Sequence, residues 1–275
     1  LEGTENLSRV FMLRQPDDAI NIRNAARAVN SATIIGGGYI GLEVAATLRK
    51  MGLEIRVIEA AERLLARVAS PPIAKKITEL HLKNGVSLHT NCGTKEIHSI
   101  NSSFDSVTLT DGTQIKSDML IVGIGVVPDS GLALKAGLET ETKNGGAILV
   151  DEFMRTSKDN ILAIGDVALK HGNSIRIESV HNAQDSAARA VATIIGERQP
   201  AYEAPRFWSD QYDANLQSVG IVPLDLEDVY QVLRPGNSVG AESFWSYHKK
   251  QLLAVETIKD IENFMLGTKC LNNDI

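Results

Sequence analysis

The stretch Thr33–Thr47, TIIGGGYIGLEVAAT, constrains the fold more than any other part of the sequence. Gly36, Gly38 and Gly41 form the pattern G-x-G-x-x-G after a short apolar run. In a strand–loop–helix unit the first glycine permits a tight turn, the second lets the backbone approach a pyrophosphate, and the third lets the helix pack on the strand. The amides at the start of such a helix face the phosphates. The pattern therefore predicts a dinucleotide site formed by Gly36, Gly38, Tyr39, Ile40 and Gly41.

The residues after this loop complete a βαβ unit. A helix is expected at 38–51, stopped by Gly52, and a second strand at 53–60. Glu59 ends that strand, where a carboxylate accepts hydrogen bonds from the adenosine ribose hydroxyls. A carboxylate would also repel a 2′-phosphate, which favours NAD over NADP. The alternative is a plain glycine turn with a solvated Glu59.

Three further charged residues lie close to the loop in sequence. Arg63 and Arg67 follow Glu59 and are expected to contact adenine or pyrophosphate, unless they are solvated arginines at a loop edge. Glu43 lies in the first turn of the helix, where an acid interacts favourably with the helix dipole. The functional alternative is that Glu43 faces the nicotinamide ring.

Periodicity and turn residues predict the other elements. Helices are expected at 16–29, 70–85, 180–196 and from about 260, and strands at 118–125, 147–151 and 161–166. Hairpins are expected at 107–115, turning at Asp111-Gly112, and at 243–258, turning at Lys249-Lys250. Both tryptophans lie beyond Pro200, where the composition shifts. The order of elements predicts an α/β part followed by a smaller mixed domain.

Composition disfavours several classes of function. The 275 residues carry a formal net charge of -6, which disfavours nucleic acid or an anionic membrane as the main partner. Cys92 and Cys270 are far apart, so neither a disulfide scaffold nor a metal site is expected, and a reducing, cytoplasmic compartment fits. The sequence opens at Leu1 without Met, and we expect it to be a fragment.

Several stretches together resemble one family. GGGYIGLEVAATLRKMG, VGIGVVPD (122–129), ILAIGD (161–166) and ESVHNAQDSAARAVATIIG (178–196) resemble the FAD-dependent pyridine nucleotide reductases. The segment APRFWSDQYDANLQSVG (204–220) looks like the putidaredoxin reductase group, the ferredoxin reductases of oxygenase systems. The resemblance covers essentially the whole chain.

The resemblance implies a fold and its domains. It implies a Rossmann-like NAD domain inserted in a truncated FAD domain, followed by a small α+β C-terminal domain. The boundaries expected are 1–13 for a remnant of the FAD domain, 14–143 for the NAD domain, 144–203 for the second FAD segment and 204–275 for the C-terminal interface domain.

The resemblance also implies site residues. Arg67, Gly123, Ile124 and Gly125 would join the NAD site. Gly165, Asp166, Val180, His181 and Trp208 would contact FAD, with Asp166 on a ribityl hydroxyl and Trp208 near the isoalloxazine ring. Glu43 would lie at the nicotinamide–flavin junction and act in catalysis. For Gly165 and Asp166 the alternative is a buried strand that ends in a turn, and for Trp208 it is an aromatic at a domain interface.

The sequence departs from that family in one respect. The family has two glycine fingerprints, whereas this chain has only the second, which serves NAD. We expect about a hundred residues to precede Leu1, because a nucleotide-binding half of that kind needs several βαβ elements. On its own, this chain is expected to bind FAD poorly and to have doubtful activity.

The function implied is a flavoprotein reductase that passes hydride from NADH to FAD and then electrons to a ferredoxin-type iron–sulfur protein, as a monomer or homodimer. Alternatives within enzymes are an NADH oxidase, a rubredoxin reductase or an oxidoreductase like apoptosis-inducing factor. An alternative of another class is a flavin-free NAD-binding sensor or interaction module.

Overall fold

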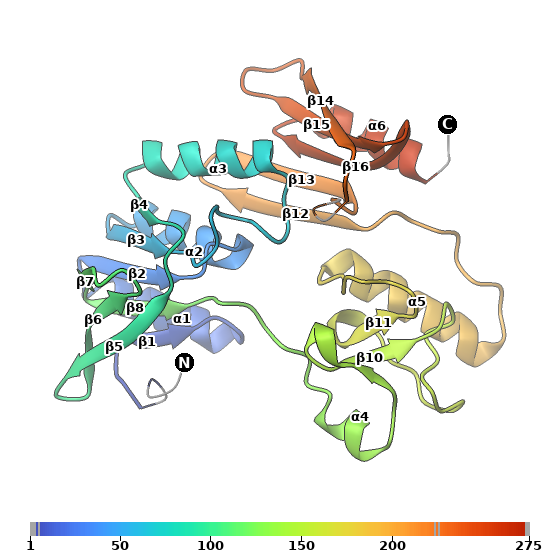
Figure 1. The fold of residues 1–275 in the computed structure, drawn as a ribbon, viewed down its shortest axis with the longest axis horizontal. Helices are drawn as coiled ribbons and strands as arrows, with labels where there is room; N and C mark the ends of the chain where they lie inside the picture. Colours follow the sequence, from blue (N-terminus) through green and yellow to red (C-terminus); the bar gives the residue numbers. More distant parts are fainter. Residues whose placement is uncertain (1–3, 5, 223, 225, 273–275) are drawn as a thin grey trace. The chain divides into compact units, whose positions relative to one another are not determined.

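The computed structural model describes residues 4, 6–222, 224 and 226–272 (Figure 1). The chain divides into two compact units. The first comprises the chain up to Gly125 together with Ser209–Leu216 and residues 222–227. The second comprises Val126–Trp208, Gln217–Ile221 and the chain from Asp228 onward.

The first unit is built on a five-stranded parallel sheet with the strand order β1-β8-β2-β3-β4. The sheet and its helices consist of β1 (Val10–Met12), α1 (Pro16–Ala26), β2 (Ser31–Ile35), α2 (Tyr39–Lys50), β3 (Glu54–Ile58), α3 (Pro71–Lys83), β4 (Ser87–His89) and β8 (Met119–Val122). The central strands β2 and β8 are almost continuously buried, as is usual for parallel strands covered on both faces. This is the Rossmann-like arrangement that the glycine pattern predicts.

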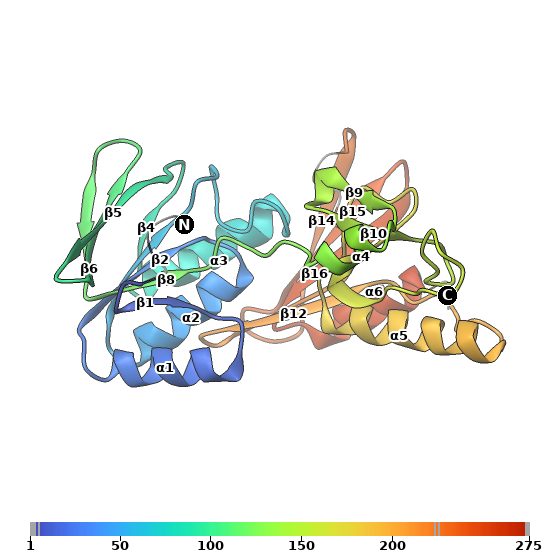
Figure 2. The same ribbon diagram turned by 90° about the horizontal axis from the view of Figure 1, so that it is seen from below.

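A second, antiparallel sheet covers one face of the parallel sheet. It contains β5 (Thr94–Ile100), β6 (Ser103–Leu109) and β7 (Gln114–Lys116), and the predicted turn at Asp111-Gly112 joins the last two. Val107 and Leu109 pack in one core with Ile35, Ile58 and Leu120 of the parallel sheet. Helices α1 and α2 lie on the other face (Figure 2).

The second unit contains a three-stranded sheet and the larger part of a five-stranded one, whose residues Ser209–Leu216 belong to the first unit. Its first part consists of α4 (Gly131–Lys135), β9 (Thr140–Glu141), η1 (Thr142–Asn144), β10 (Ala147–Val150), η2 (Gly165–Val167), β11 (Ala168–Lys170) and α5 (Val180–Ile195). The strands pair in the order β11-β10-β9, and Ala190 of α5 packs in one core with Ile148 and Val150 of β10. Ser179 caps the start of α5, and Gly196 ends it in the left-handed conformation, so the helix predicted at 180–196 is confirmed.

The C-terminal region forms a five-stranded sheet in the order β12-β13-β16-β15-β14 and one helix. These elements are β12 (Arg206–Gln211), β13 (Ala214–Gly220), β14 (Val229–Pro235), β15 (Glu242–His248), β16 (Gln251–Ile258) and α6 (Ile261–Leu271). The predicted turn at Lys249-Lys250 is confirmed, with both lysines at positive φ. Trp245 is buried, donates its indole N–H to Ser243 and lies beneath the Arg234 guanidinium.

The strand predicted at 161–166 is wrong. Leu162 makes a single bridge to Arg155, and Gly165 begins a turn of 3-10 helix with φ +69°. A positive φ interrupts an extended strand, so the third strand of this sheet forms later, as β11. The apolar composition of ILAIG therefore reflects packing of a loop rather than a strand.

Among the residues that the structure describes, no helix is both long enough and apolar enough to span a membrane.

We expect Gly267→Ala to destabilise the second unit. Gly267 is buried in α6, and a Cβ at this position would lie 2.7 Å from Val255 Cγ2 and 2.8 Å from Val255 Cβ. Alanine favours a helix by about 1 kcal/mol, but overpacking costs about 1–3 kcal/mol, so overpacking should win. Urea unfolding measures the result. The double variant Gly267→Ala with Val255→Ala should lose less unfolding free energy than the two single variants lose in sum. Strictly additive losses would contradict this explanation.

Candidate functional site

In the predicted glycine loop, the backbones of Gly36, Gly41 and Gly123 approach one another closely. Gly36 has φ +111°, and a Cβ on it would lie 2.2 Å from the carbonyl oxygen of Gly123. A Cβ on Gly41 would lie 2.1 Å from the carbonyl oxygen of Gly36. Real atoms cannot approach so closely, so these positions require glycine. Gly123 follows β8, and its amide donates to Ile35 at 2.8 Å, which places it beside the loop as predicted.

Gly38 differs from its neighbours because space is open around it. Within the described chain, no heavy atom beyond its chain neighbours lies within 4 Å of the position that a Cβ on Gly38 would occupy. Gly38 is the N-cap of α2 and has no side chain of its own with which to cap the helix. Tyr39 and Ile40 form the first turn, and Ile40 is exposed. A helix start with a glycine N-cap and room for a ligand fits a dinucleotide pyrophosphate.

Glu59 has a contact that sequence reasoning missed. Its Oε2 accepts the amide hydrogen of Gly37 at 2.7 Å, and its Oε1 accepts that of Ala61 at 2.8 Å. The carboxylate therefore ties the glycine loop to the end of β3. A carboxylate offers about four lone-pair positions, so two remain for ribose hydroxyls. The ribose contact itself stays a prediction.

The two arginines near the loop behave differently. Arg63 donates to the carbonyl oxygens of residues 64, 65 and 66, so its guanidinium supports its own loop. Arg67 is exposed, and a terminal nitrogen lies 3.6 Å from the position of a Cβ on Gly125. Gly125 has φ +102°, and the adjacent Ile124 is exposed. Arg67, Ile124 and Gly125 are therefore accessible to a ligand, as their predicted role requires.

The sequence predicts Glu43 in the first turn of the helix, but α2 begins at Tyr39 and has no acidic residue in its first turn, so Glu43 lies in the second turn. Its side chain is half-buried and has a partner far away in sequence. The hydroxyl of Ser209, on β12, donates to its Oε1 at 2.6 Å. Burial raises the pKa of Glu43 above its ordinary value, the hydrogen bond from Ser209 opposes that rise, and the nearby Asp210 carboxylate adds to it. Glu43 is therefore more than a partner of the helix dipole.

Ser209 is itself held by two buried residues that sequence reasoning did not single out. The side-chain amide of Gln211 donates to Ser209 Oγ at 3.1 Å, and its Oε1 lies 2.8 Å from His81 Nε2. Tyr212 packs edge-on against the His81 ring, with centroids 5.1 Å apart. The only available signal was alternation in the segment FWSDQ, since strand period places Ser209 and Gln211 on one face.

Burial of His81 predicts a pH dependence of stability. Burial lowers the pKa of His81 below its ordinary 6.5, so the unfolded chain binds a proton that the folded chain does not. The unfolding free energy should therefore fall as pH drops below 6.5, and His81→Gln should lack this component. Because only the wild type loses unfolding free energy through His81 as the pH falls, the difference in unfolding free energy between wild type and His81→Gln should shrink from pH 8 to pH 5.5. Urea unfolding at the two pH values measures it. His171→Gln, at an exposed histidine, is the control, and a constant difference would contradict the assignment.

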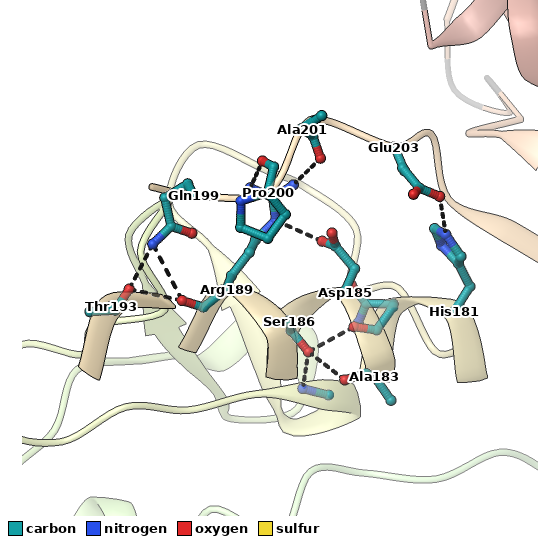
Figure 3. Close-up of polar contacts among 12 residues, drawn as sticks. His181, Ala183, Asp185, Ser186, Arg189, Thr193, Gln199, Pro200, Ala201 and Glu203 are labelled. Carbon is teal, nitrogen blue, oxygen red and sulfur yellow. Dashed lines mark hydrogen bonds and ion pairs between the residues drawn. The ribbon is translucent and has the colours of Figure 1, made fainter. Parts of the chain in front are cut away.

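In the second unit, the start of α5 carries Val180 and His181 as predicted. The first intrahelical bond is donated by Ala183, and Ser179 Oγ accepts from Asn182. The amides of Val180 and His181 therefore precede the helical bonding pattern and suit an external acceptor. The imidazole of His181 points to Glu203 at 3.2 Å (Figure 3). Glu203 also accepts from Arg206.

Gly165 and Asp166 lie beside the same helix. The amide of Gly165 donates to Ser186 Oγ at 2.9 Å, which fastens the η2 turn to α5. This amide hydrogen is therefore not available to a cofactor. The contact that Gly165 can offer a cofactor is the close approach of its Cα, which carries no side chain. Asp166 is exposed, and its backbone carbonyl accepts from Arg176. Farther along α5, Arg189 pairs with Asp185 and donates to Ala201, which holds the chain leading to β12 (Figure 3).

A cavity of about 270 Å³ opens between α5, β12, β13 and α6. His181, Trp208 and Phe264 line it together with Gln184, Arg206, Phe207 and Gln217. Trp208 is 48% exposed, so its ring is available for stacking. The volume lies just below the range of whole ligand pockets, so the cavity suits one ring system rather than a complete dinucleotide.

The predicted site residues thus fall into two groups. The first unit brings together Gly36, Gly38, Tyr39, Ile40, Gly41, Glu43, Glu59, Arg67, Gly123, Ile124 and Gly125. The second unit contains Gly165, Asp166, Val180, His181 and Trp208, of which the cavity unites His181 and Trp208.

Comparisons with known proteins agree with this fold. Residues 1–187 match the pyridine nucleotide-disulphide oxidoreductase family, and residues 206–275 match a domain described as reductase C-terminal. The first match covers more than half of the sequence, so the chain belongs to the pyridine nucleotide-disulphide oxidoreductase family. The predicted family is confirmed, and so is the predicted fold class, a Rossmann-like α/β region followed by a small α+β C-terminal domain, which the structure forms around an antiparallel sheet.

Individual relatives are reductases. The chain is 40% identical to the 5,5'-dehydrodivanillate O-demethylase ferredoxin reductase subunit of Sphingobium, over 94% of this chain and 62% of that protein. It is 38% identical to a rubredoxin-NAD(+) reductase of Pseudomonas putida, over 94% of this chain and 66% of the relative. The covalent putidaredoxin reductase–putidaredoxin complex matches with TM-score 0.90 and 33% identity, over 98% of this chain and 64% of that chain. The sequence spans less than two thirds of the length of each.

Proposed function

We propose that this chain binds NADH in the first unit and forms part of an FAD-dependent reductase that passes electrons to a ferredoxin-type iron–sulfur protein. One observation carries the NADH assignment: the start of α2 has open space at its N-cap, Gly38, and a carboxylate, Glu59, lies at the end of the next strand. Family membership and the relatives named above support the rest.

The second unit would hold the flavin ring. When bound, FAD accepts hydride from a nicotinamide and releases electrons singly to a one-electron acceptor. Trp208 and Phe264 would pack on the ring, and the amides of Val180 and His181 would face its electron-accepting edge. In this proposal 144–203 is the second flavin segment and 204–275 the interface domain, with 14–143 as the NAD domain.

Glu43 would be the acid next to the nicotinamide. It lies in the second turn of α2, close after the loop that would bind the pyrophosphate, and it is half-buried. Binding holds the two rings in reactive order, so the work of the protein is orientation and electrostatics.

A ferredoxin is the acceptor we favour, with rubredoxin as the second candidate because a rubredoxin-NAD(+) reductase is 38% identical. We further propose a cytoplasmic protein, either monomeric or homodimeric.

Gly38→Ala and Gly41→Ala should separate binding from folding. A methyl on Gly38 meets open space at φ -80°, so the melting temperature should stay close to wild type. That methyl would occupy the expected approach of the pyrophosphate, so NADH should bind roughly tenfold more weakly or worse, about 1.4 kcal/mol. A methyl on Gly41 collides with the Gly36 carbonyl, so folding itself should suffer. Calorimetric titration and circular-dichroism melting test both, and unchanged NADH affinity in Gly38→Ala would contradict the site.

Glu59 should set the choice of cofactor. Glu59→Gln removes the negative charge and should narrow the preference for NADH over NADPH, measured as the ratio of the two dissociation constants. Glu54→Gln, on an exposed acid at the start of the same strand, is the matched control. A chain that binds NADPH as tightly as NADH before any substitution would contradict the assignment.

The acceptor is identified by turnover. The protein purified with its flavin should oxidise NADH and reduce a [2Fe–2S] ferredoxin faster than rubredoxin or oxygen. Faster turnover with rubredoxin or oxygen would support the corresponding enzyme alternative. NADH binding without any oxidation would support the sensor alternative and refute the reductase.

A further inference from the structure

We propose that Ser209 is a positioning residue, held by Gln211 and His81, that fixes the orientation and protonation state of the Glu43 carboxylate. The use of that carboxylate in hydride transfer rests on the proposed function. The four residues form one hydrogen-bonded row, and all of them belong to the first unit.

The row has a direction. Gln211 donates its amide hydrogen to Ser209, so its carbonyl oxygen faces His81 and must accept from Nε2. The hydroxyl of Ser209 has a single hydrogen, which it donates to Glu43 Oε1 at 2.6 Å. Every hydrogen in the row therefore points toward Glu43, which is the arrangement that an ionised carboxylate requires.

The opposite direction would need a protonated Glu43. If the Gln211 amide were turned over, the Ser209 hydroxyl would donate to Gln211 and could only accept from Glu43. His81 Nε2 would then have to accept, with the hydrogen on Nδ1. The direction of the row and the protonation of Glu43 are therefore coupled.

Solvent does not reach three of the four residues in this row. Ser209, Gln211 and His81 are 1%, 0% and 0% exposed, whereas Glu43 is half-buried. A hydrogen bond in such surroundings is stronger than one in water, and an unmade one costs more. The alternation of β12 produces this burial, because Trp208 and Asp210 lie on the exposed face.

The influences on the pKa of Glu43 oppose one another. Burial and the Asp210 carboxylate raise its pKa, whereas the hydrogen bond from Ser209 lowers it. Burial also lowers the pKa of His81, so the far end of the row is a neutral imidazole that adds no positive charge. Of these three influences on the carboxylate, the Ser209 hydroxyl is therefore the one that favours the ionised form of Glu43.

The test is a pH titration of Glu43 in the whole chain by carbon-13 NMR of labelled glutamate side chains, assigned with Glu43→Gln. Ser209→Ala should shift the Glu43 titration to higher pH, because the stabilising donor is lost. Asp210→Asn, at the next residue, should shift it to lower pH, because a repelling charge is lost. Ser209→Thr keeps a hydroxyl and should restore a titration close to wild type.

A kinetic readout follows in the flavin-loaded protein. Ser209→Ala should slow flavin reduction by NADH roughly tenfold, the size of one hydrogen bond of about 1.4 kcal/mol, with less effect on NADH affinity. Ser209→Thr should recover most of the rate. A merely structural role would lower stability and leave the titration of Glu43 in place.

The outcomes separate this inference from the proposed function. A Glu43 titration that is identical in wild type and Ser209→Ala overturns the inference, whatever the chain binds. Failure of wild type to bind NADH refutes the proposed function, whereas the titration still decides the role of Ser209. If Ser209→Ala does not fold, Ser209→Cys keeps the packing with a weaker donor and should give a smaller shift in the same direction.

Discussion

The close approach of the backbones of Gly36, Gly41 and Gly123 is the constraint on which the first unit depends. The end of β2, the start of α2 and the end of β8 meet there at distances that leave no room for a side-chain carbon. Because these contacts are so tight, the helix start is carried to one defined place, and Glu59 locks the loop by accepting the amide hydrogen of Gly37. Gly38 is left facing open space, so the same geometry that excludes side chains also creates the opening for a ligand.

Local sequence patterns predicted most elements, because their causes are local. The α5 helix has a serine cap and a glycine that ends it in the left-handed conformation, and both are visible in the sequence. The strand predicted at 161–166 failed because apolar composition does not reveal the backbone of Gly165. The glycine loop could be predicted in detail, since its steric demands fall on a few consecutive residues.

The surroundings of Glu43 could not be predicted in the same way. Its partner Ser209 lies on a strand 166 positions later in the chain, and its burial depends on how that strand packs. The sequence offered a choice between a helix-dipole partner and a residue near the nicotinamide. The structure adds a property that neither alternative includes. Burial disfavours the ionised form of Glu43, and the hydroxyl of Ser209 favours it. Glu59 likewise combines a predicted ligand role with a structural one that only the folded loop reveals.

The two tryptophans give the chain a pair of built-in optical probes. Trp208 borders the cavity and is 48% exposed, whereas Trp245 is 2% exposed and has its indole N–H bonded. Because the sequence has no other tryptophan, its intrinsic emission divides between one indole that dissolved quenchers reach and one that they do not. A ligand in the cavity would quench the emission of Trp208 and leave that of Trp245 as an internal reference. Binding at the cavity can therefore be followed without any added label.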